Sequence, residues 1–207
     1  MDERIEVVLL DLGNVLVDFD YRISAKRISH FCAKSPEDII KLFFSSGAAV
    51  SFETGKISPQ DFFGQVKEML DLKLSYEAFV PIWNEVFFLS AKNRGVFSLV
   101  NYLREYYKVA LISNTNILHY EYLKKHFPVF NIFHNVFVSC ELGLIKPDHL
   151  IYQKALQVLN VPAQRVFYTD DRIDLVQSAK ELGLQAFVFS GVRRLKADLL
   201  SLNITVN

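Results

Sequence analysis

Residues 7–14 read VVLLDLGN. The first four are apolar and two of them are β-branched, which predicts a short buried strand. A carboxylate, Asp11, follows at once, and Gly13 then provides a turn. Burying an unpaired charge inside a sheet is costly, whereas open α/β sheets place their active sites at the carboxyl ends of parallel strands. Asp11 is therefore the first candidate catalytic residue, and an aspartate in an ordinary turn is the alternative.

Further apolar runs alternate with helical patterns along the chain. Together with the first run, over residues 5–10, they cover 108–112, 135–139, 165–169 and 185–189. This alternation predicts an α/β fold built on a doubly wound parallel sheet. We also expect helices over 148–159 and 173–182, with Gly183 ending the second of them.

The long gap between the first two strand runs is too long for a single crossover and predicts an insertion. Ser35 and Ser58 are each followed by a proline and, three residues on, by an acid, which is typical of a helix N-terminus. We find no strand pattern within 20–88. The prediction is a helical cap over 18–88, inserted into a core formed by 1–17 and 89–207. The aromatic residues near the return to the core, Trp83, Phe87 and Phe88, are interpreted as packing residues.

Composition narrows the function classes. The 207 residues are 51% hydrophobic, and 23 basic residues balance 23 acidic ones. The zero net charge argues against a nucleic-acid or membrane-surface partner. No apolar run reaches about 18 residues and the first residues are not basic, so we expect no membrane span and no signal peptide. Cys32 and Cys140 lack metal-site spacing and are expected to be free thiols in a cytoplasmic protein. The oligomeric state is expected to be monomer or homodimer.

Polar residues follow three of the other strand runs. Ser113 and Asn114 can hold phosphate oxygens near the start of the next helix. Lys146, in a loop stiffened by a proline, can neutralise both a carboxylate and a phosphoryl group. Asp170 and Asp171 repel each other unless a cation lies nearby, and Mg²⁺ prefers such oxygen ligands. Each group alone is explained by a helix cap or a solvated surface, but parallel strands bring all of them to one edge of the sheet.

These segments resemble, in order, the motifs of the haloacid dehalogenase superfamily of phosphotransferases. The resemblance runs from about residue 5 to 190, and its motifs are Asp11-Leu-Gly-Asn-Val15, Ser113-Asn114, Lys146-Pro147 and Asp170-Asp171. It implies a Rossmann-like core with an inserted helical cap. It also implies a Mg²⁺-dependent phosphatase that acts on a small phosphorylated metabolite.

The resemblance assigns roles to individual residues. Asp11 is implied to be the nucleophile that forms an aspartyl-phosphate, with Lys146 and Ser113 as further catalytic residues. The implied phosphate-binding residues are Ser113, Asn114, Lys146 and Asn14. The implied metal ligands are Asp11, the backbone carbonyl of Gly13, Asp171 and, in support, Asp170.

Two positions depart from the family pattern. Most phosphatases of the family carry a second aspartate two residues after the nucleophile, where it serves as acid and base, but this chain has Gly13. The loss predicts low activity, and Asp18, Asp20 and His119 are the candidates to replace it. The Asp-Leu-Gly-Asn-Val form is similar to a bacterial branch that includes an α-D-glucose-1-phosphate phosphatase, which favours a sugar phosphate as substrate. Leu175 stands where relatives often have Asn or Asp to support the metal site.

Two other functions stay open on the sequence. A catalytically lapsed phosphate-binding protein of the same fold is favoured by Gly13 and Leu175. A haloacid dehalogenase also uses an aspartate nucleophile, but it works without a metal. Asp170 and Asp171 therefore count against the dehalogenase.

Overall fold

A five-stranded parallel sheet forms the centre of the computed structural model, which describes residues 4–206. The strand order is β5–β4–β1–β6–β7. The strands are β1 (Val7–Leu10), β4 (Lys108–Ser113), β5 (Asn135–Val138), β6 (Val166–Asp170) and β7 (Gln185–Val188). The five predicted strand runs are confirmed, each to within two residues at its ends. β1 pairs with β4 on one side and β6 on the other, so it lies at the middle of the sheet.

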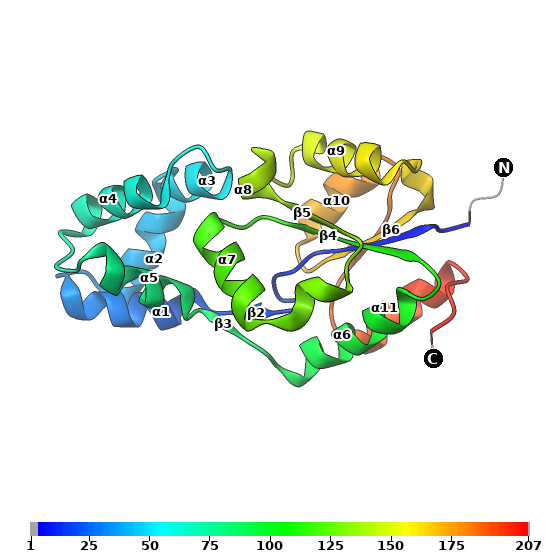
Figure 1. Ribbon diagram of the computed structural model, residues 1–207, viewed down its shortest axis with the longest axis horizontal. Coiled ribbons are helices and arrows are strands. Elements are labelled where there is room, and N and C mark those ends of the chain that lie inside the picture. The colour runs from blue at the N-terminus through cyan, green and yellow to red at the C-terminus, as the bar shows by residue number, and fades with distance from the viewer. Residues whose placement is uncertain (1–3, 207) are drawn as a thin grey trace.

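Helices cover both faces of this sheet (Figure 1). Val8 and Leu10 point to a face covered by α6 (Ala91–Leu103), α7 (Ile117–His126) and α11 (Val192–Ser201). Val7 and Leu9 point to the opposite face, beneath α9 (His149–Leu159) and α10 (Ile173–Glu181). This alternation of side chains along β1 explains why the run is apolar throughout: both faces are buried. The doubly wound α/β fold is confirmed.

Shorter helical turns complete the connections. They are α8 (Ser139–Leu142), η2 (Pro128–Ile132) and η3 (Ala163–Arg165). The predicted bounds of α9 and α10 agree with the structure to within one residue at each end. Asp148 caps α9, and Gly183 follows α10 with a φ of +90°, a conformation that glycine adopts without strain.

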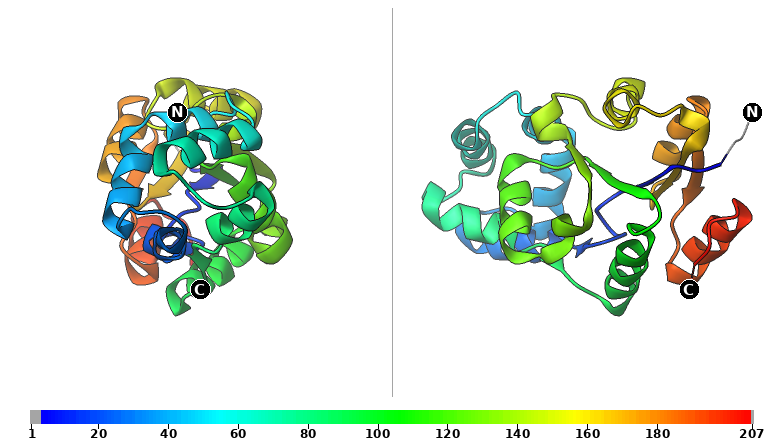
Figure 2. Two further views of the ribbon diagram at one scale, coloured as in Figure 1. Left: turned by 90° about the vertical axis from the view of Figure 1, so that its left-hand side faces the viewer. Right: turned by 45° about the vertical axis from the view of Figure 1, so that its right-hand side comes forward.

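A helical segment, residues 21–84, projects from one end of the sheet (Figures 1 and 2). It comprises α1 (Tyr21–Ile28), η1 (Ser29–Phe31), α2 (Pro36–Ser45), α3 (Ala48–Glu53), α4 (Pro59–Leu70) and α5 (Tyr76–Asn84). Ser35 and Ser58 cap α2 and α4 as predicted, each accepting a hydrogen bond at 3.1 Å from the backbone N–H three residues on. The segment buries its own aromatic cluster, which includes Phe52, Phe62 and Phe79. Its division from the core at residues 18 and 88 stays a prediction.

A two-stranded antiparallel ribbon links this segment to the core. β2 (Asp18–Phe19) carries the chain out and β3 (Phe87–Phe88) brings it back. The expectation that no strand lies within 20–88 is wrong at Phe87–Phe88. Two residues are too few to show an alternating pattern, and their conformation depends on a partner far away in the sequence.

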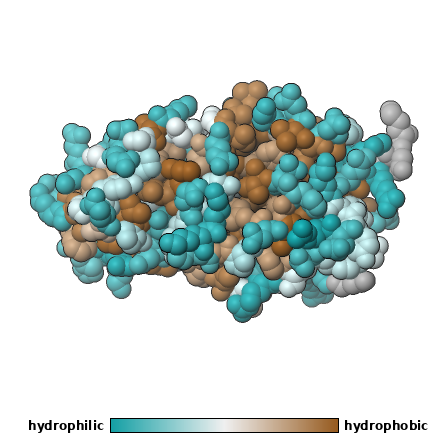
Figure 3. Space-filling model, in the orientation of Figure 1, coloured by the Kyte–Doolittle hydropathy of each residue, from teal (hydrophilic) through white to brown (hydrophobic). Residues whose placement is uncertain are grey.

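The surface carries scattered apolar groups among polar ones (Figure 3). Ile173 and Phe44 are examples, at 74% and 61% exposed. Single exposed apolar residues are normal on a protein surface. Within residues 4–206, none of the helices has both the length and the apolar character needed to cross a membrane. Cys32 and Cys140 are free, as expected.

Candidate active site

Asp11 lies at the centre of the carboxyl edge of the sheet. It follows β1 directly, and its backbone N–H donates to the carbonyl of Thr169 on β6 at 3.0 Å. The two strands beside β1 end in Ser113 and Asp170. The polar residues after three adjacent strands therefore meet at one edge, as expected for a parallel sheet.

Lys146 joins two of the acids. Its Nζ lies 2.6 Å from Asp11 Oδ1 and 2.7 Å from Asp170 Oδ2, and it also donates to the carbonyl of Ile112 at 3.1 Å. The side chain is only 1% exposed. Asn114 fixes the lysine backbone, because its Nδ2 donates to the Lys146 carbonyl at 2.9 Å and its Oδ1 accepts from the Lys146 N–H at 2.8 Å. The amide of Asn114 thus positions Lys146, and its predicted contact with phosphate stays a prediction.

Tyr168 is a member of this group that the sequence reading missed. Its hydroxyl donates to Asp170 Oδ2 at 2.5 Å and accepts from Lys146 Nζ at 3.3 Å. The signal was present: residues two apart on a strand point to the same face, so Tyr168 and Asp170 share a side of β6. The other carboxylate oxygen of Asp170, Oδ1, accepts a hydrogen bond from the Arg172 N–H at 3.0 Å. Both oxygens of the buried Asp170 are therefore hydrogen-bonded.

Asn14 and Asp171 form the outer part of the site. Asn14 adopts a positive φ of 54° and its Nδ2 donates to Asp171 Oδ2 at 2.8 Å. Asn14 thus supports the second aspartate directly. Its predicted role as a phosphate ligand stays a prediction.

Three carboxylates converge tightly enough to hold a cation. Oxygen atoms of Asp11, Asp170 and Asp171 all lie within 4.8 Å of one another.

Burial raises the pKa of Asp11, and repulsion from the other two acids raises it further, although Lys146 opposes both effects. Burial also raises the pKa of Asp171. Burial alone would lower the pKa of Lys146, but the attraction of Asp11 and Asp170 outweighs it and keeps the amine protonated. One lysine leaves this cluster net negative, and a hard divalent ion such as Mg²⁺ matches such oxygen donors.

A cavity of about 610 Å³ opens above the cluster. It is roomy enough for a small phosphorylated molecule. All the predicted site residues line it together: Asp11, Gly13, Asn14, Ser113, Asn114, Lys146, Asp170 and Asp171. The helical segment contributes Tyr21, Phe44 and Glu53 to the same cavity. Leu175 also lines it and offers no polar atom from its side chain.

Gly13 has an aromatic ring in the place where a side chain would begin. A Cβ built on Gly13 would lie 2.8 Å from Cε1 of Phe19, closer than real Cβ contacts. Phe19 is itself held by Tyr21 and Phe87, whose ring centroids lie 5.1 and 6.4 Å away. The space that a side chain at position 13 would occupy is therefore filled by the ring of Phe19.

The candidate replacement acids are engaged elsewhere. Asp18 pairs with Lys92 at 2.6 Å and accepts from Asn93 at 3.2 Å. Asp20 caps α1 and forms hydrogen bonds with Arg22, which lower the pKa of Asp20.

His119 lines the cavity, but both ring nitrogens are used. Nε2 lies 3.1 Å from the carbonyl of Trp83, which can only accept, and Nδ1 lies 3.0 Å from Nδ2 of Asn116, which can only donate. These partners fix the neutral tautomer with the proton on Nε2. Burial lowers the pKa of His119 to about 4, so the ring is neutral at pH 7. A proton held in this way is not available to a leaving group.

The chain is similar to known proteins over most of its length. A family model for haloacid dehalogenase-like hydrolases matches residues 5–183. The D-ribitol-5-phosphate phosphatase of Bacteroides thetaiotaomicron is 23% identical over 189 residues, which are 88% of this chain and 91% of that protein.

Solved structures of this family also resemble the chain over most of its length. A haloacid dehalogenase family enzyme from Bacteroides thetaiotaomicron, crystallised with magnesium and inorganic phosphate, is 26% identical with a TM-score of 0.80, covering 90% of this chain and 95% of that one. An L-2-haloacid dehalogenase is 20% identical with a TM-score of 0.64, covering 89% of this chain and 86% of that one. At 20% identity, the similarity to the L-2-haloacid dehalogenase shows a shared fold alone.

Proposed function

The chain belongs to the haloacid dehalogenase-like hydrolase family, and from this membership we propose that it is a Mg²⁺-dependent phosphatase of a small phosphorylated metabolite. A sugar phosphate or a related compound is the favoured substrate. The observation that carries the proposal is the convergence of three carboxylates within 4.8 Å beside a buried lysine that pairs with two of them. The phosphatase among the relatives and the structure with magnesium and phosphate support it.

The proposed metal ligands are Asp11, Asp171 and the backbone carbonyl of Gly13. Asp170 takes a supporting role, because both of its oxygens already accept hydrogen bonds from Lys146, Tyr168 and the Arg172 N–H. When bound, Mg²⁺ supplies positive charge that lets a carboxylate approach an anionic phosphoryl group.

Asp11 is the proposed nucleophile. One of its carboxylate oxygens attacks phosphorus while the bond from phosphorus to the leaving oxygen breaks, which gives an aspartyl-phosphate. The leaving oxygen takes a proton from solvent and departs as an alcohol. Water then attacks the aspartyl-phosphate, loses a proton and releases inorganic phosphate, restoring the Asp11 carboxylate. Lys146 holds Oδ1 of Asp11 throughout, and Ser113 with Lys146 is proposed to bind the transferred phosphoryl group.

The helical segment is proposed to act as a cap. It contributes Tyr21, Phe44 and Glu53 to the cavity that contains Asp11, so a substrate bound there contacts both parts of the chain. A cap of this kind excludes water and contacts the leaving group rather than the phosphoryl group.

Metal dependence is the first test. With 5 mM Mg²⁺ we expect phosphate release from a panel of sugar and polyol phosphates, and excess EDTA should lower it by about 100-fold or more, because a metal contributes several kcal/mol of charge stabilisation. Asp171→Asn should lower it similarly. Asp71→Asn, at an exposed position on the helical segment, is the matched control and should change nothing.

The outcomes separate the three functions. Release that survives EDTA contradicts the metal proposal. A folded wild-type protein that releases no phosphate from any panel member is a lapsed enzyme. Halide release from a 2-haloacid without metal identifies a dehalogenase.

The filled space at Gly13 gives a second prediction. Gly13→Asp should destabilise the protein by about 1–3 kcal/mol, because the new side chain collides with Phe19. Adding Phe19→Ala should relieve the collision and raise phosphate release from substrates with poor leaving groups above that of the Phe19→Ala single variant. Urea unfolding and kinetics on an alkyl phosphate measure the two effects. Equal stability of Gly13→Asp and wild type would contradict the steric account.

A further inference from the structure

A second, smaller cavity lies beside the main one, lined by the helical segment and by Asn116 of the core. It measures about 20 Å³, enough for a single water-sized group. Its lining is largely aromatic and includes Phe43, Phe62 and Trp83. Tyr21, Phe44, Ala49 and Glu53 line both cavities. The two cavities therefore adjoin each other.

The indole N–H of Trp83 has no partner there. The residue is 5% exposed, and within residues 4–206 its buried Nε1 forms no hydrogen bond. A buried donor without a partner is rare and costly in native proteins, because it loses its hydrogen bond to water on folding. The ring is held firmly, since Phe43 and Phe62 pack against it with centroids 5.2 and 5.0 Å away. Trp83 is a packing residue, as expected, but its indole N–H is free to donate a hydrogen bond to a ligand.

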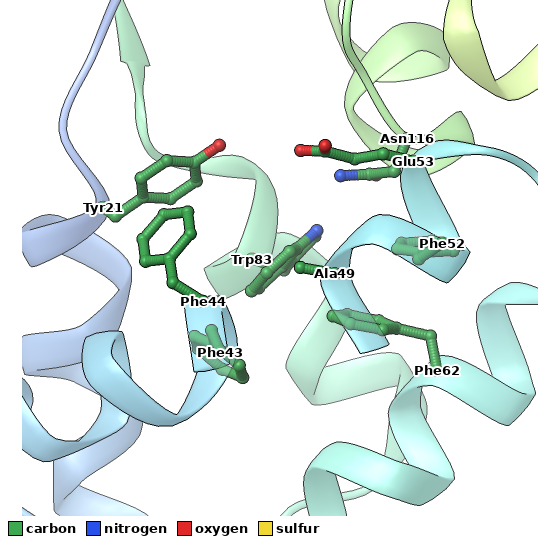
Figure 4. A pocket seen from close by; sticks show the side chains of 9 residues that line it. All are labelled: Tyr21, Phe43, Phe44, Ala49, Phe52, Glu53, Phe62, Trp83 and Asn116. Carbon is green, nitrogen blue, oxygen red and sulfur yellow. The ribbon is translucent and has the colours of Figure 1, made fainter. Parts of the chain in front are cut away.

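Glu53 contributes a carboxylate to the same place. Figure 4 shows its carboxylate and the Tyr21 hydroxyl directed toward one another across the cavity, with the Trp83 nitrogen pointing to the same gap. No hydrogen bond or ion pair among the residues described in the structure engages the Glu53 carboxylate. Burial raises the pKa of Glu53 to about 7, with Arg172 opposing the shift. Burial also raises the pKa of Tyr21, and the nearby Glu53 raises it further.

This donor and acceptor set selects one kind of ligand group. The group must accept a hydrogen bond from the Trp83 N–H and donate one to the Glu53 carboxylate. A hydroxyl does both. A second phosphate or a carboxylate has no proton to donate and is repelled by Glu53, while an ammonium group has no lone pair for Trp83. The aromatic lining suits the C–H faces of a carbon chain or ring.

We propose that Trp83, Glu53 and Tyr21 bind a hydroxyl of the leaving group, so that the substrate is a phosphorylated polyol or sugar rather than a simple alkyl or aryl phosphate. The inference rests on the proposed function for the position of the phosphoryl group at Asp11. It adds the part of the substrate that is recognised and the residues that recognise it.

Matched substrates test the proposal by kinetics. D-ribitol 5-phosphate and pentyl phosphate carry the same phosphate on five carbons but differ in hydroxyls. For ribitol 5-phosphate, Trp83→Phe should raise KM about 3–10-fold and Glu53→Gln about 10–100-fold, the usual effects of losing a neutral and a charged hydrogen bond. With both variants, the loss of kcat/KM should be larger for ribitol 5-phosphate than for pentyl phosphate. Glu68→Gln, an exposed glutamate on α4, is the control and should affect neither substrate.

Binding tests the proposal without turnover. Trp83 is the only tryptophan in the chain, so its fluorescence reports on this cavity alone. In the Asp11→Asn protein, ribitol 5-phosphate should shift the emission, and Glu53→Gln should weaken its binding. Pentyl phosphate should bind at least about 10-fold more weakly.

The two proposals fail in different ways. If wild type releases no phosphate but ribitol 5-phosphate still binds and shifts the emission, the phosphatase proposal fails and the hydroxyl site stands. The hydroxyl site is overturned if wild type releases phosphate but Trp83→Phe and Glu53→Gln lower kcat/KM equally for the two substrates. It is also overturned if neither variant changes kcat/KM for ribitol 5-phosphate.

Stability against pH gives an independent readout of Glu53. Its pKa is higher in the folded chain than the ordinary value of 4.5, so the unfolded chain ionises first and stability is lost as the pH rises from 4.5 to about 7. Glutamine cannot ionise. Glu53→Gln should therefore have a higher urea midpoint than wild type at pH 8, and the difference should narrow at pH 5. An equal midpoint at pH 8 would contradict the raised pKa of Glu53.

Discussion

Asp11→Asn is expected to lower phosphate release by about 10⁴-fold or more while leaving the protein folded. An amide oxygen is a far weaker nucleophile than a carboxylate, and loss of a nucleophile commonly removes most of an enzyme's rate enhancement. Asparagine has nearly the same shape, so the side chain still fits between β4 and β6. Asp170 remains to pair with Lys146 at 2.7 Å, which keeps the lysine from being buried alone.

The measurement is phosphate release with Mg²⁺, together with circular dichroism and a melting curve. Acid-quenched wild type incubated with a ³²P-labelled substrate should retain label on the protein, and Asp11→Asn should not. Asp20→Asn is the matched control: asparagine caps a helix as well as aspartate, so activity should stay within about twofold. Unchanged release by Asp11→Asn would sink the aspartyl-phosphate mechanism.

Lys146→Met is expected to damage both stability and activity. Methionine fills similar space, but it leaves Asp11 and Asp170 as two buried carboxylates without their counter-ion. Removing one partner of a buried ion pair costs about 3–5 kcal/mol, and here the two remaining charges also repel each other. Activity should fall by about 100-fold or more, because the proposed nucleophile loses the group that orients it.

Urea unfolding at pH 7.5 measures the loss of stability. Mg²⁺ should recover part of it, since the cation offsets the same negative charges. Lys154→Met, at an exposed position on α9, is the control and should change stability by about 0.5 kcal/mol or less. Stability equal to wild type in EDTA would contradict the two buried ion pairs that Lys146 forms with Asp11 and Asp170.

The sequence predicted the parts of this site that depend on local patterns. The apolar run before Asp11, the Ser-Pro starts at Ser35 and Ser58, and the acids after β6 each carry their own signal within a few residues. Parallel pairing then brings the strand ends to one edge, so the grouping of Asp11, Ser113 and Asp170 could be predicted without coordinates.

Other features carried weaker signals or none. Tyr168 could have been placed beside Asp170 from the alternation of a strand, but nothing local indicated that its hydroxyl joins Lys146. Asp18, Asp20 and His119 were reasonable replacement acids by residue type. Each is engaged by partners that the sequence does not identify, including Lys92 for Asp18 and the Trp83 carbonyl for His119.

The sequence by itself determined the five strands of the parallel sheet, the helix starts at Ser35 and Ser58 and the order of the site residues, because these follow from periodicity, capping and topology. Only the tertiary structure decided which polar atoms are satisfied and which are left open. Phe19 fills the space at Gly13, and Trp83 and Glu53 keep a free donor and a free acceptor facing one cavity. The physical reason is that a hydrogen bond or a collision depends on distances of a few ångströms between residues far apart in the chain, and local sequence does not encode such distances.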